Sequence, residues 1–157
     1  MTALFTDVFL SALLFGAITA AVPLLLAGLG EQMSEKAGVL NIGIEGMMIA
    51  GAYTGFLGAY LSGSLWLGFL TGGLAGCAVA LIMVLLCVRL GLNQIVIGIG
   101  LTLGLEGLTA LAHHFQFSRT YPRLPAADIT VIAGLSDIPV IGPALFKHHL
   151  IVYLAVA

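Results

Sequence analysis

The feature that most constrains this chain is a run of 43 residues, 46–88, that contains no charged side chain. A second uncharged run covers residues 8–30. At a helical rise of 1.5 Å per residue, the shorter run extends about 34 Å, enough to cross a hydrocarbon core of about 30 Å. The longer run is about twice what one crossing needs, so it must turn back. Ser62-Gly63-Ser64 is the cluster of turn-forming residues near its middle.

Composition places such a chain in a bilayer. Charged residues make up 8 % and apolar residues 61 % of the sequence, against roughly 25 % and 45–50 % in soluble domains. Because lipid offers no partner for unpaired backbone groups, we predict an all-α, polytopic integral membrane helix bundle. The net charge of −2 gives no indication of nucleic acid as a partner.

Four complete spans are predicted within one transmembrane domain covering residues 1–157, and the start of a fifth follows at residues 150–157. Eight residues reach only about 12 Å as a helix, so we expect the chain to be the N-terminal part of a longer protein. Residues 113–149 hold four His and four of the five Pro. We interpret them as an extramembrane loop with a short strand or helix near residues 129–135. The complete spans are predicted at residues 8–30, 42–61, 65–88 and 95–112.

Glycines recur four residues apart in the predicted spans. Small residues at this spacing form a flat stripe on one helix face and let two backbones approach closely, which favours association in lipid. The spacing predicts that the helices pack against one another. The predicted packing positions are Gly51, Gly55, Gly68, Gly72, Gly76, Gly100 and Gly104.

Residues 28–52 form a polar, glycine-rich insert between two apolar runs. The insert is either a turn in water or irregular backbone buried against protein, because lipid exposure of such backbone is excluded. Glu31, Glu35, Lys36 and Asn41 are candidates for a role in the pathway or in coupling. A solvated turn is the favoured interpretation of Glu35 and Lys36 over a gate, and Glu31 could equally be solvated. Asn41 is the predicted N-cap of the following helix. Glu45 is either an acid favoured by the helix macrodipole or a group that faces a cavity.

Glu106 lies deep in the fourth predicted span, with no basic residue four positions away. It either lines a pathway or forms a hydrogen bond to another helix, unless the span is displaced along the sequence. A path for a neutral polar solute would offer amide and hydroxyl groups. The candidates for such groups are Asn93, Gln94, Thr102 and Thr109.

The sequence contains no motif of an enzyme. No GxxxxGK[ST] phosphate-binding loop is present, so any ATP that drives this chain must bind another polypeptide. The pairs His113-His114 and His148-His149 flank the predicted loop and are interpreted as interfacial polar groups. We expect no metal site, no cofactor in this chain and no catalytic residue.

Two segments carry a resemblance to a known family: PLLLAGLGEQMSEKAGVLNIGIEGMMIAGAY at residues 23–53 and CVRLGLNQIVIGIGLTLGLEGL at residues 87–108. They resemble permease subunits of ABC importers in the branched-chain amino acid and simple sugar superfamily, and they are most like the nucleoside-uptake group. The resemblance implies a multi-pass protein of the plasma (inner) membrane, paired with a second permease subunit as a homo- or heterodimer. It further implies two cytoplasmic ATPase subunits that hold ATP and Mg, and an extracytoplasmic substrate-binding protein.

The resemblance also implies an orientation and a function. Residues 31–41 and 89–94 would face the cytoplasm and the long loop would face outward, although a count of Lys and Arg slightly favours the reverse. The segment that docks on the ATPase would lie beyond residue 157. The expected function is ATP-driven uptake of nucleosides, with a simple sugar or branched-chain amino acid as the alternative substrate. The competing class is an ion- or proton-coupled secondary transporter, in which Glu45 and Glu106 would carry the ion or proton.

Overall fold

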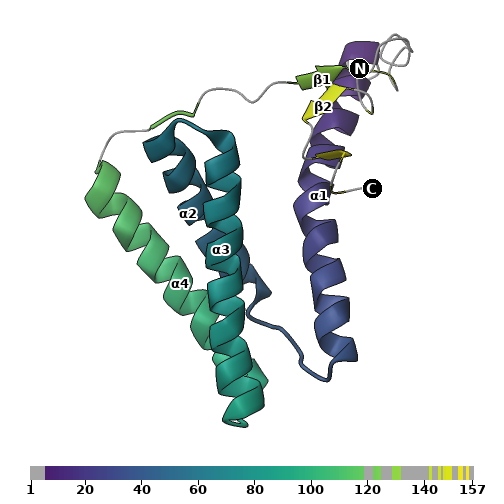
Figure 1. The fold of residues 1–157 in the computed structure, drawn as a ribbon. Helices are drawn as coiled ribbons and strands as arrows, with labels where there is room; N and C mark the ends of the chain where they lie inside the picture. The colour runs from purple at the N-terminus through teal and green to yellow at the C-terminus, as the bar shows by residue number, and fades with distance from the viewer. Residues whose placement is uncertain are drawn as a thin grey trace. The chain divides into compact units, whose positions relative to one another are not determined.

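The computed structural model describes residues 6–118, 122–124, 129–131, 142, 145, 147–149, 152, 153 and 155. The described chain is an all-α helix bundle with one short strand pair, as predicted (Figure 1). It divides into two compact units, Met1–Gly30 with Ala126–Ala157 and Glu31–Pro125, which are treated separately below. The elements are α1 (Asp7–Lys36), α2 (Ile44–Ser62), α3 (Leu65–Val84), η2 (Leu85–Arg89), α4 (Gln94–Phe117), β1 (Ile129–Val131) and β2 (Lys147–His149).

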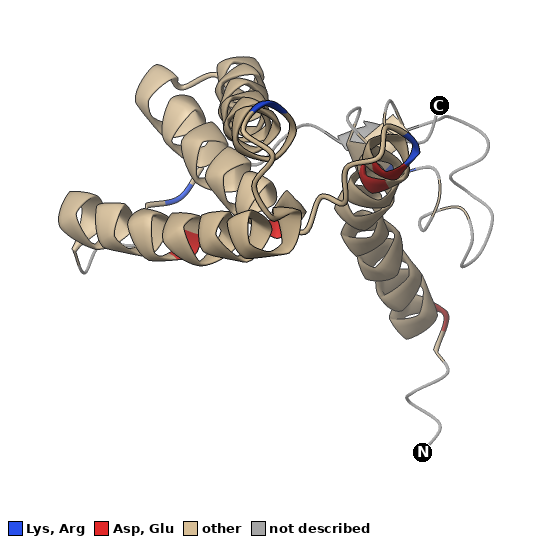
Figure 2. Cartoon of the chain, turned by 90° about the horizontal axis from the view of Figure 1, so that it is seen from below, with Lys and Arg blue, Asp and Glu red and all other residues tan. Residues whose placement is uncertain are grey.

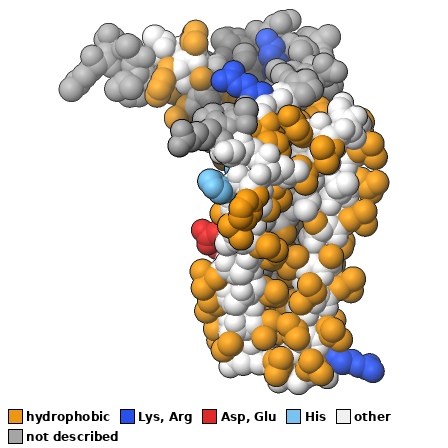
Figure 3. All heavy atoms as spheres, turned by 90° about the vertical axis from the view of Figure 1, so that its left-hand side faces the viewer, with side chains coloured by type: hydrophobic (Ala, Val, Ile, Leu, Met, Phe, Trp, Pro, Cys, Tyr) orange, Lys and Arg blue, Asp and Glu red, His pale blue; other side chains and the backbone are white. Residues whose placement is uncertain are grey.

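Three helical segments of the described chain are long and apolar enough to cross a membrane: Asp7–Lys36, Leu65–Arg89 and Gln94–Phe117. Charged residues are sparse along these helices (Figure 2). The face shown in Figure 3 is covered mainly by hydrophobic side chains. Large aliphatic side chains such as Leu81 and Val96 are 68 % and 65 % exposed. An apolar surface of this extent is stable against lipid rather than water. The count of four spans stays a prediction.

The first unit contains the N-terminal part of α1 and the strand pair. β1 and β2 are antiparallel, with Ile129 opposite His149, so part of the predicted segment at 129–135 is a strand. The imidazole of His148 stacks on the ring of Phe15 at 4.5 Å between centroids. The Tyr153 hydroxyl accepts a hydrogen bond from the His148 amide at 3.3 Å. Most of the predicted fifth span at 150–157 lies outside the described residues.

In the second unit, α2 and α3 form a hairpin around the predicted turn, where Gly63 adopts a positive φ of 68°. The two helices then approach through glycines. A Cβ at Gly72 would lie 2.7 Å from the Gly51 carbonyl oxygen, and a Cβ at Gly68 would lie 2.7 Å from the Gly55 carbonyl oxygen. Both distances are shorter than any ordinary contact, so this crossing requires residues without side chains.

The remaining packing glycines differ from these four. A Cβ at Gly76 would make only an ordinary contact, 3.9 Å from the Met47 carbonyl oxygen. A Cβ at Gly100 or Gly104 would meet nothing within 4 Å. Among the described residues, therefore, the stripe of Gly100 and Gly104 packs against nothing.

Helix α1 extends past the first predicted span, residues 8–30. Helix α1 continues to Lys36 because residues 31–36 contain strong helix formers and no glycine or proline. It stops where Gly38 adopts a φ of 83°. The amide of Gly38 donates to the Glu35 carbonyl at 2.9 Å and that of Val39 donates to the Ser34 carbonyl at 3.0 Å. This pair of bonds is a Schellman motif, which satisfies carbonyls at a helix end.

Helix α4 also extends past the residues predicted for its span and into those predicted for the loop. Helix α4 continues beyond residue 112 to Phe117, so His113 and His114 lie on its last turns rather than in a loop. Residues 113–117 lack helix breakers, and the helix ends only where Ser118 adopts a φ of 49°. In the third span the helix continues from α3 into one π-helical turn, η2. The predicted loop at 113–149 therefore begins no earlier than residue 118.

Candidate functional site

The linker between α1 and α2, residues 37–43, is held by two side chains from different helices. One carboxylate oxygen of Glu31 accepts a hydrogen bond from the backbone amide of Asn41 at 2.9 Å. The side-chain oxygen of Gln94, the first residue of α4, accepts from the Leu40 amide at 2.6 Å. Amides outside a helix need such partners when they leave water. The polar insert is thus irregular only over this linker, which is exposed at residue 37 and buried at Gly43.

Helices α2 and α4 both begin near this linker, and their first turns are capped differently. Asn93 caps α4, because its side-chain oxygen accepts from the amides of Ile95 at 2.9 Å and Val96 at 3.4 Å. The prediction that Asn41 caps α2 is wrong. The cap position is occupied by Gly43, and no side-chain hydrogen bond caps the helix there. The side-chain amide nitrogen of Asn41 instead lies 3.6 Å from the Met47 sulfur. A Cβ at Gly43 would lie 3.1 Å from the Met83 sulfur and 3.4 Å from the Gly98 Cα, so a larger residue at the cap would require Met83 to shift.

That close approach of α2 and α4 rests on two glycines that the sequence analysis did not single out. A Cβ at Gly46 would lie 2.9 Å from the Thr102 Cα, and a Cβ at Gly98 would lie 2.8 Å from the Gly43 nitrogen. The signal was available, because Gly98 and Thr102 are small residues four positions apart. We call this region the tight crossing.

From Thr102 in the tight crossing toward its C-terminal end, α4 carries a stripe of polar side chains. Thr102, Thr109 and His113 are seven and four residues apart, so they share one face of the helix. All three are half-buried. The Thr109 hydroxyl donates to the Leu105 carbonyl of its own helix at 2.8 Å. The stripe contains hydroxyl and imidazole groups, and one carboxylate, that of Glu106, lies at its exposed edge.

Three oxygens at the linker and the tight crossing are buried and have no hydrogen-bond partner within the described part of the chain: Glu31 Oε2, Asn41 Oδ1 and Thr102 Oγ1. A buried polar atom left in this state costs about 1–3 kcal/mol. These oxygens can therefore accept hydrogen bonds from a solute, from water or from another subunit.

The other charged candidates lie on the surface of the described chain. Glu35 and Lys36 are exposed on the last turn of α1. Glu45 is exposed in the first turn of α2, where the macrodipole stabilises an acid. Glu106 is also exposed, one turn after Thr102 at the edge of the polar stripe. The structure brings Glu31, Asn41, Asn93 and Gln94 together around the linker, but it leaves these four charged residues outside that group.

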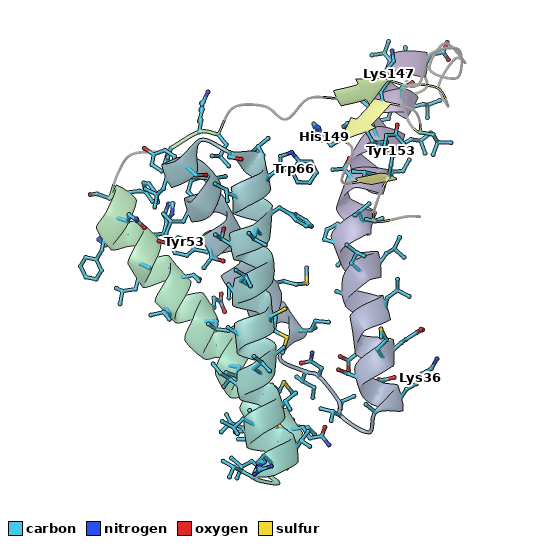
Figure 4. All side chains as sticks on the ribbon, in the orientation of Figure 1. Lys36, Tyr53, Trp66, Lys147, His149 and Tyr153 are labelled. Carbon is cyan, nitrogen blue, oxygen red and sulfur yellow. The ribbon has the colours of Figure 1, made fainter. Side chains whose placement is uncertain are left out.

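Aromatic side chains join α2 and α4 at the other end of the stripe. The Tyr53 hydroxyl donates to the Gln116 side-chain oxygen at 2.9 Å, and the Tyr53 ring meets the His113 ring edge-on at 6.3 Å. Phe56 packs edge-on against Phe117 at 5.7 Å. In Figure 4, Tyr53 lies between α4 and the α2–α3 pair.

These large rings keep the helices apart where the glycines of the tight crossing bring them together. Consistent with this, α4 diverges from α2 and α3 toward its C-terminal end (Figure 1). A cavity of about 300 Å³ opens there, lined by Tyr53, Phe56, His113 and Pro122. We call it the aromatic cavity. The sequence analysis missed it because His113 was placed outside the spans.

A second cavity, of about 340 Å³, lies at the linker end of α4. It is lined by Leu40, Leu92, Asn93, Gln94 and Ile95. The polar stripe of α4 therefore has one cavity near each end, with the tight crossing between them. Such an arrangement suits the stepwise passage of a small polar molecule along α4.

The sequence of the chain is similar to those of known transport proteins. Residues 13–146 match a family described as branched-chain amino acid transport system / permease component. The chain is 40 % identical, over 94 % of its length and 45 % of the relative, to a putative glucose ABC transporter permease of Haloferax volcanii. It is 34 % identical, over 81 % of its length and 42 % of the relative, to a guanosine ABC transporter permease of Bacillus subtilis.

A nucleoside ABC transporter permease of Lactococcus lactis is 27 % identical over 82 % of this chain and 43 % of the relative. The chain thus spans less than half the length of each of these curated relatives. No solved structure matches it.

Proposed function

Because the chain belongs to the permease-component family of branched-chain amino acid transport systems, we propose that it forms part of the membrane-spanning subunit of an ATP-driven importer of nucleosides. The observation that carries this proposal is the polar stripe of α4, in which uncharged groups face α2 between two cavities. A transport path needs polar groups inside an otherwise apolar bundle. Intramembrane polar residues of this kind mark substrate pathways.

The chemistry of the stripe supports a neutral substrate. Thr102, Thr109 and His113 are half-buried, whereas the nearest carboxylate, Glu106, is exposed at the edge of the stripe. A nucleoside is uncharged and carries many hydrogen-bonding groups, so hydroxyl and amide partners suit it. Two of the relatives described above are named for guanosine and for nucleosides, which supports the same substrate class.

Glucose is the second candidate substrate. The relative that is 40 % identical to this chain over 148 aligned residues is named a putative glucose permease. Glucose is also neutral and hydrogen-bonding, so the stripe alone does not separate the two. For either substrate, the proposed path uses no ion carried by Glu45 or Glu106, which are both exposed.

The proposed assembly follows from the family and from the absence of a phosphate-binding loop in the sequence. ATP and Mg are held by two cytoplasmic ATPase subunits, a second permease subunit completes the path, and an extracytoplasmic binding protein delivers the substrate. The protein lies in the plasma (inner) membrane with the linker at residues 37–43 toward the cytoplasm. The ATPase subunits then bias α2 and α4 between two packings, one closed at the tight crossing and one open there.

Uptake into proteoliposomes tests this function. The full-length permease, its ATPase subunits and its binding protein are reconstituted together, and guanosine and glucose uptake are measured with ATP, without ATP and with a pH gradient alone. We expect guanosine uptake that requires ATP hydrolysis. Uptake driven by the pH gradient without ATP would identify a secondary transporter instead. ATP-dependent uptake of glucose alone would replace the nucleoside with the sugar.

A further inference from the structure

The aromatic cavity differs in chemistry from the rest of the α2–α4 interface. Its lining consists of the rings of Tyr53, Phe56, His113 and Pro122, whereas the linker and tight crossing offer carbonyl, carboxylate and hydroxyl oxygens. Phe117 lies behind the cavity, 7 % exposed, and contacts the rings of both Phe56 and His113 at 5.7 and 5.0 Å. The cavity is therefore an open pocket lined by aromatic and proline rings.

These rings do not have the placement of aromatic residues that anchor a helix at the membrane surface. Anchoring rings are directed outward to the lipid headgroups. Phe115, on the same turn of α4, has that placement and is 78 % exposed. Tyr53, Phe56 and His113 are instead half-buried between helices. Their position between helices leaves these rings to line the cavity rather than to face the lipid headgroups.

The size and polarity of the cavity restrict the ligand. A volume of about 300 Å³ lies at the lower end of ordinary ligand sites, which measure about 300–1,000 Å³. The polar groups are few: the Tyr53 hydroxyl, which already donates to Gln116 and can still accept, and the two ring nitrogens of His113. A sugar ring would leave most of its hydroxyl groups unpaired here. A flat heteroaromatic ring would stack on the aromatic faces and pair its edge with these two groups.

We propose that the aromatic cavity binds the planar base of the transported nucleoside. This inference rests on the proposed function and assigns one part of the substrate to one part of the path. The base stacks between the rings of Tyr53 and Phe56 while its edge pairs with His113. The ribose, which carries the hydroxyl groups, is left to face the polar stripe at Thr109. Stacking on side chains tolerates different bases, so the site accepts both purine and pyrimidine nucleosides.

The test compares ring-removing variants with a matched aromatic control. Tyr53→Leu and Phe56→Leu remove a ring from the cavity, Tyr53→Phe keeps the ring, and Phe115→Leu removes an exposed ring from the same end of α4. Each full-length variant is reconstituted with its partner subunits, and uridine and guanosine uptake are measured against concentration. Removal of one stacking ring is expected to raise the half-saturating concentration about 5- to 100-fold. Tyr53→Phe is expected to change it by less than about 10-fold, and Phe115→Leu to leave it unchanged.

Competition separates base binding from a merely structural effect. Free hypoxanthine and free ribose are added as inhibitors of uridine uptake. In the wild type, hypoxanthine is expected to inhibit at lower concentration than ribose, and this preference is expected to disappear in Phe56→Leu. Unchanged half-saturation and unchanged preference in both leucine variants would overturn the base site while leaving nucleoside transport intact. A wild-type complex that transports glucose but no nucleoside would overturn the proposed substrate and the base site together.

A photoreactive nucleoside gives a second readout that does not depend on turnover. Irradiation of the complex with 8-azidoguanosine is expected to label the peptides that contain Tyr53 or His113. Excess guanosine is expected to prevent the labelling. Labelling confined to peptides outside α2 and the C-terminal half of α4 would contradict the proposal, even if the leucine variants lowered uptake.

Discussion

Adjacent glycines on α3 provide a matched pair for testing the packing of α2 against α3. Gly72 faces α2, where an added Cβ would lie 2.7 Å from the Gly51 carbonyl oxygen and 3.3 Å from the Gly55 Cα. The shorter distance is about 0.7 Å below the 3.4 Å at which ordinary contact begins. Gly73 points away, and an added Cβ there would meet nothing within 4 Å.

The two alanine variants should differ in their effect on the free energy of unfolding. Replacing glycine with alanine inside a helix stabilises by about 0.5–1 kcal/mol at either position. Only Gly72→Ala also forces the backbones apart, and overpacking of this kind costs about 1–3 kcal/mol. The propensity term cancels in the comparison. Gly72→Ala should therefore be about 1–3 kcal/mol less stable than Gly73→Ala.

The assay is reversible denaturation of the full-length permease in detergent, followed by circular dichroism, with both variants in the same micelles. Gly73→Ala controls for expression, detergent and propensity. Gly68→Ala repeats the test at a second position, where a Cβ would lie 2.7 Å from the Gly55 carbonyl oxygen. Equal stability of Gly72→Ala and Gly73→Ala would refute the close backbone packing of α2 and α3.

Three further predictions concern the linker and the tight crossing. Asn93→Ala removes the cap of α4 and should destabilise the full-length permease in the same assay by about 0.5–2 kcal/mol, whereas Asn93→Asp should retain most of that stability; equal losses would argue against a capping role. Gly46→Ala places a Cβ 2.9 Å from the Thr102 Cα, so uptake should fall at least about tenfold, whereas Gly104→Ala, with open space around it, should not reduce uptake. Glu31→Ala leaves the Asn41 amide without its acceptor and should lower stability by about 1–3 kcal/mol; Glu31→Gln, which keeps an acceptor oxygen, should lower it less.

Much of the helical fold could be predicted from charge and length alone. The uncharged runs and the Ser62-Gly63-Ser64 turn located the α2–α3 hairpin. An uncharged run long enough for two crossings must turn, and the turn needs a residue that tolerates a positive φ, here Gly63. The glycines of this hairpin, Gly51, Gly55, Gly68 and Gly72, were identifiable because their spacing places them on one face of each helix.

Helix ends were harder to predict, because hydropathy marks the membrane and not the end of hydrogen bonding. Helix α1 continues six residues beyond the apolar run, and α4 continues through two His. The glycine at position 38 was the usable sequence signal for the first of these ends, because glycine commonly follows a helix in a conformation with positive φ. The end at Ser118 has no comparable signal in the sequence.

The candidate site was only partly visible in the sequence for a physical reason. Asn93, Gln94 and Thr102 were recognisable as polar groups in apolar surroundings, but only tertiary packing places the Leu40 backbone amide against Gln94 and Gly46 against Thr102. The spacing rule that selected Gly100 and Gly104 equally allowed Gly98 with Thr102, and only the crossing of α2 and α4 decides between the two faces. The aromatic cavity depends on Tyr53 and His113, which are 60 residues apart in the sequence and meet only in the fold.

Thiol accessibility along α4 tests most directly whether its polar stripe lines the substrate path. Single cysteines are introduced as Thr102→Cys and Thr109→Cys on the stripe, and as Leu103→Cys and Leu111→Cys on the opposite side, where the leucines are 63 % and 53 % exposed. The native Cys77 and Cys87 are first replaced by alanine. During ATP-driven turnover, a charged, water-soluble thiol reagent should modify the two stripe cysteines, guanosine should slow that reaction, and the two outer cysteines should not react. Modification of Leu103→Cys and Leu111→Cys with no reaction at the stripe would contradict the account.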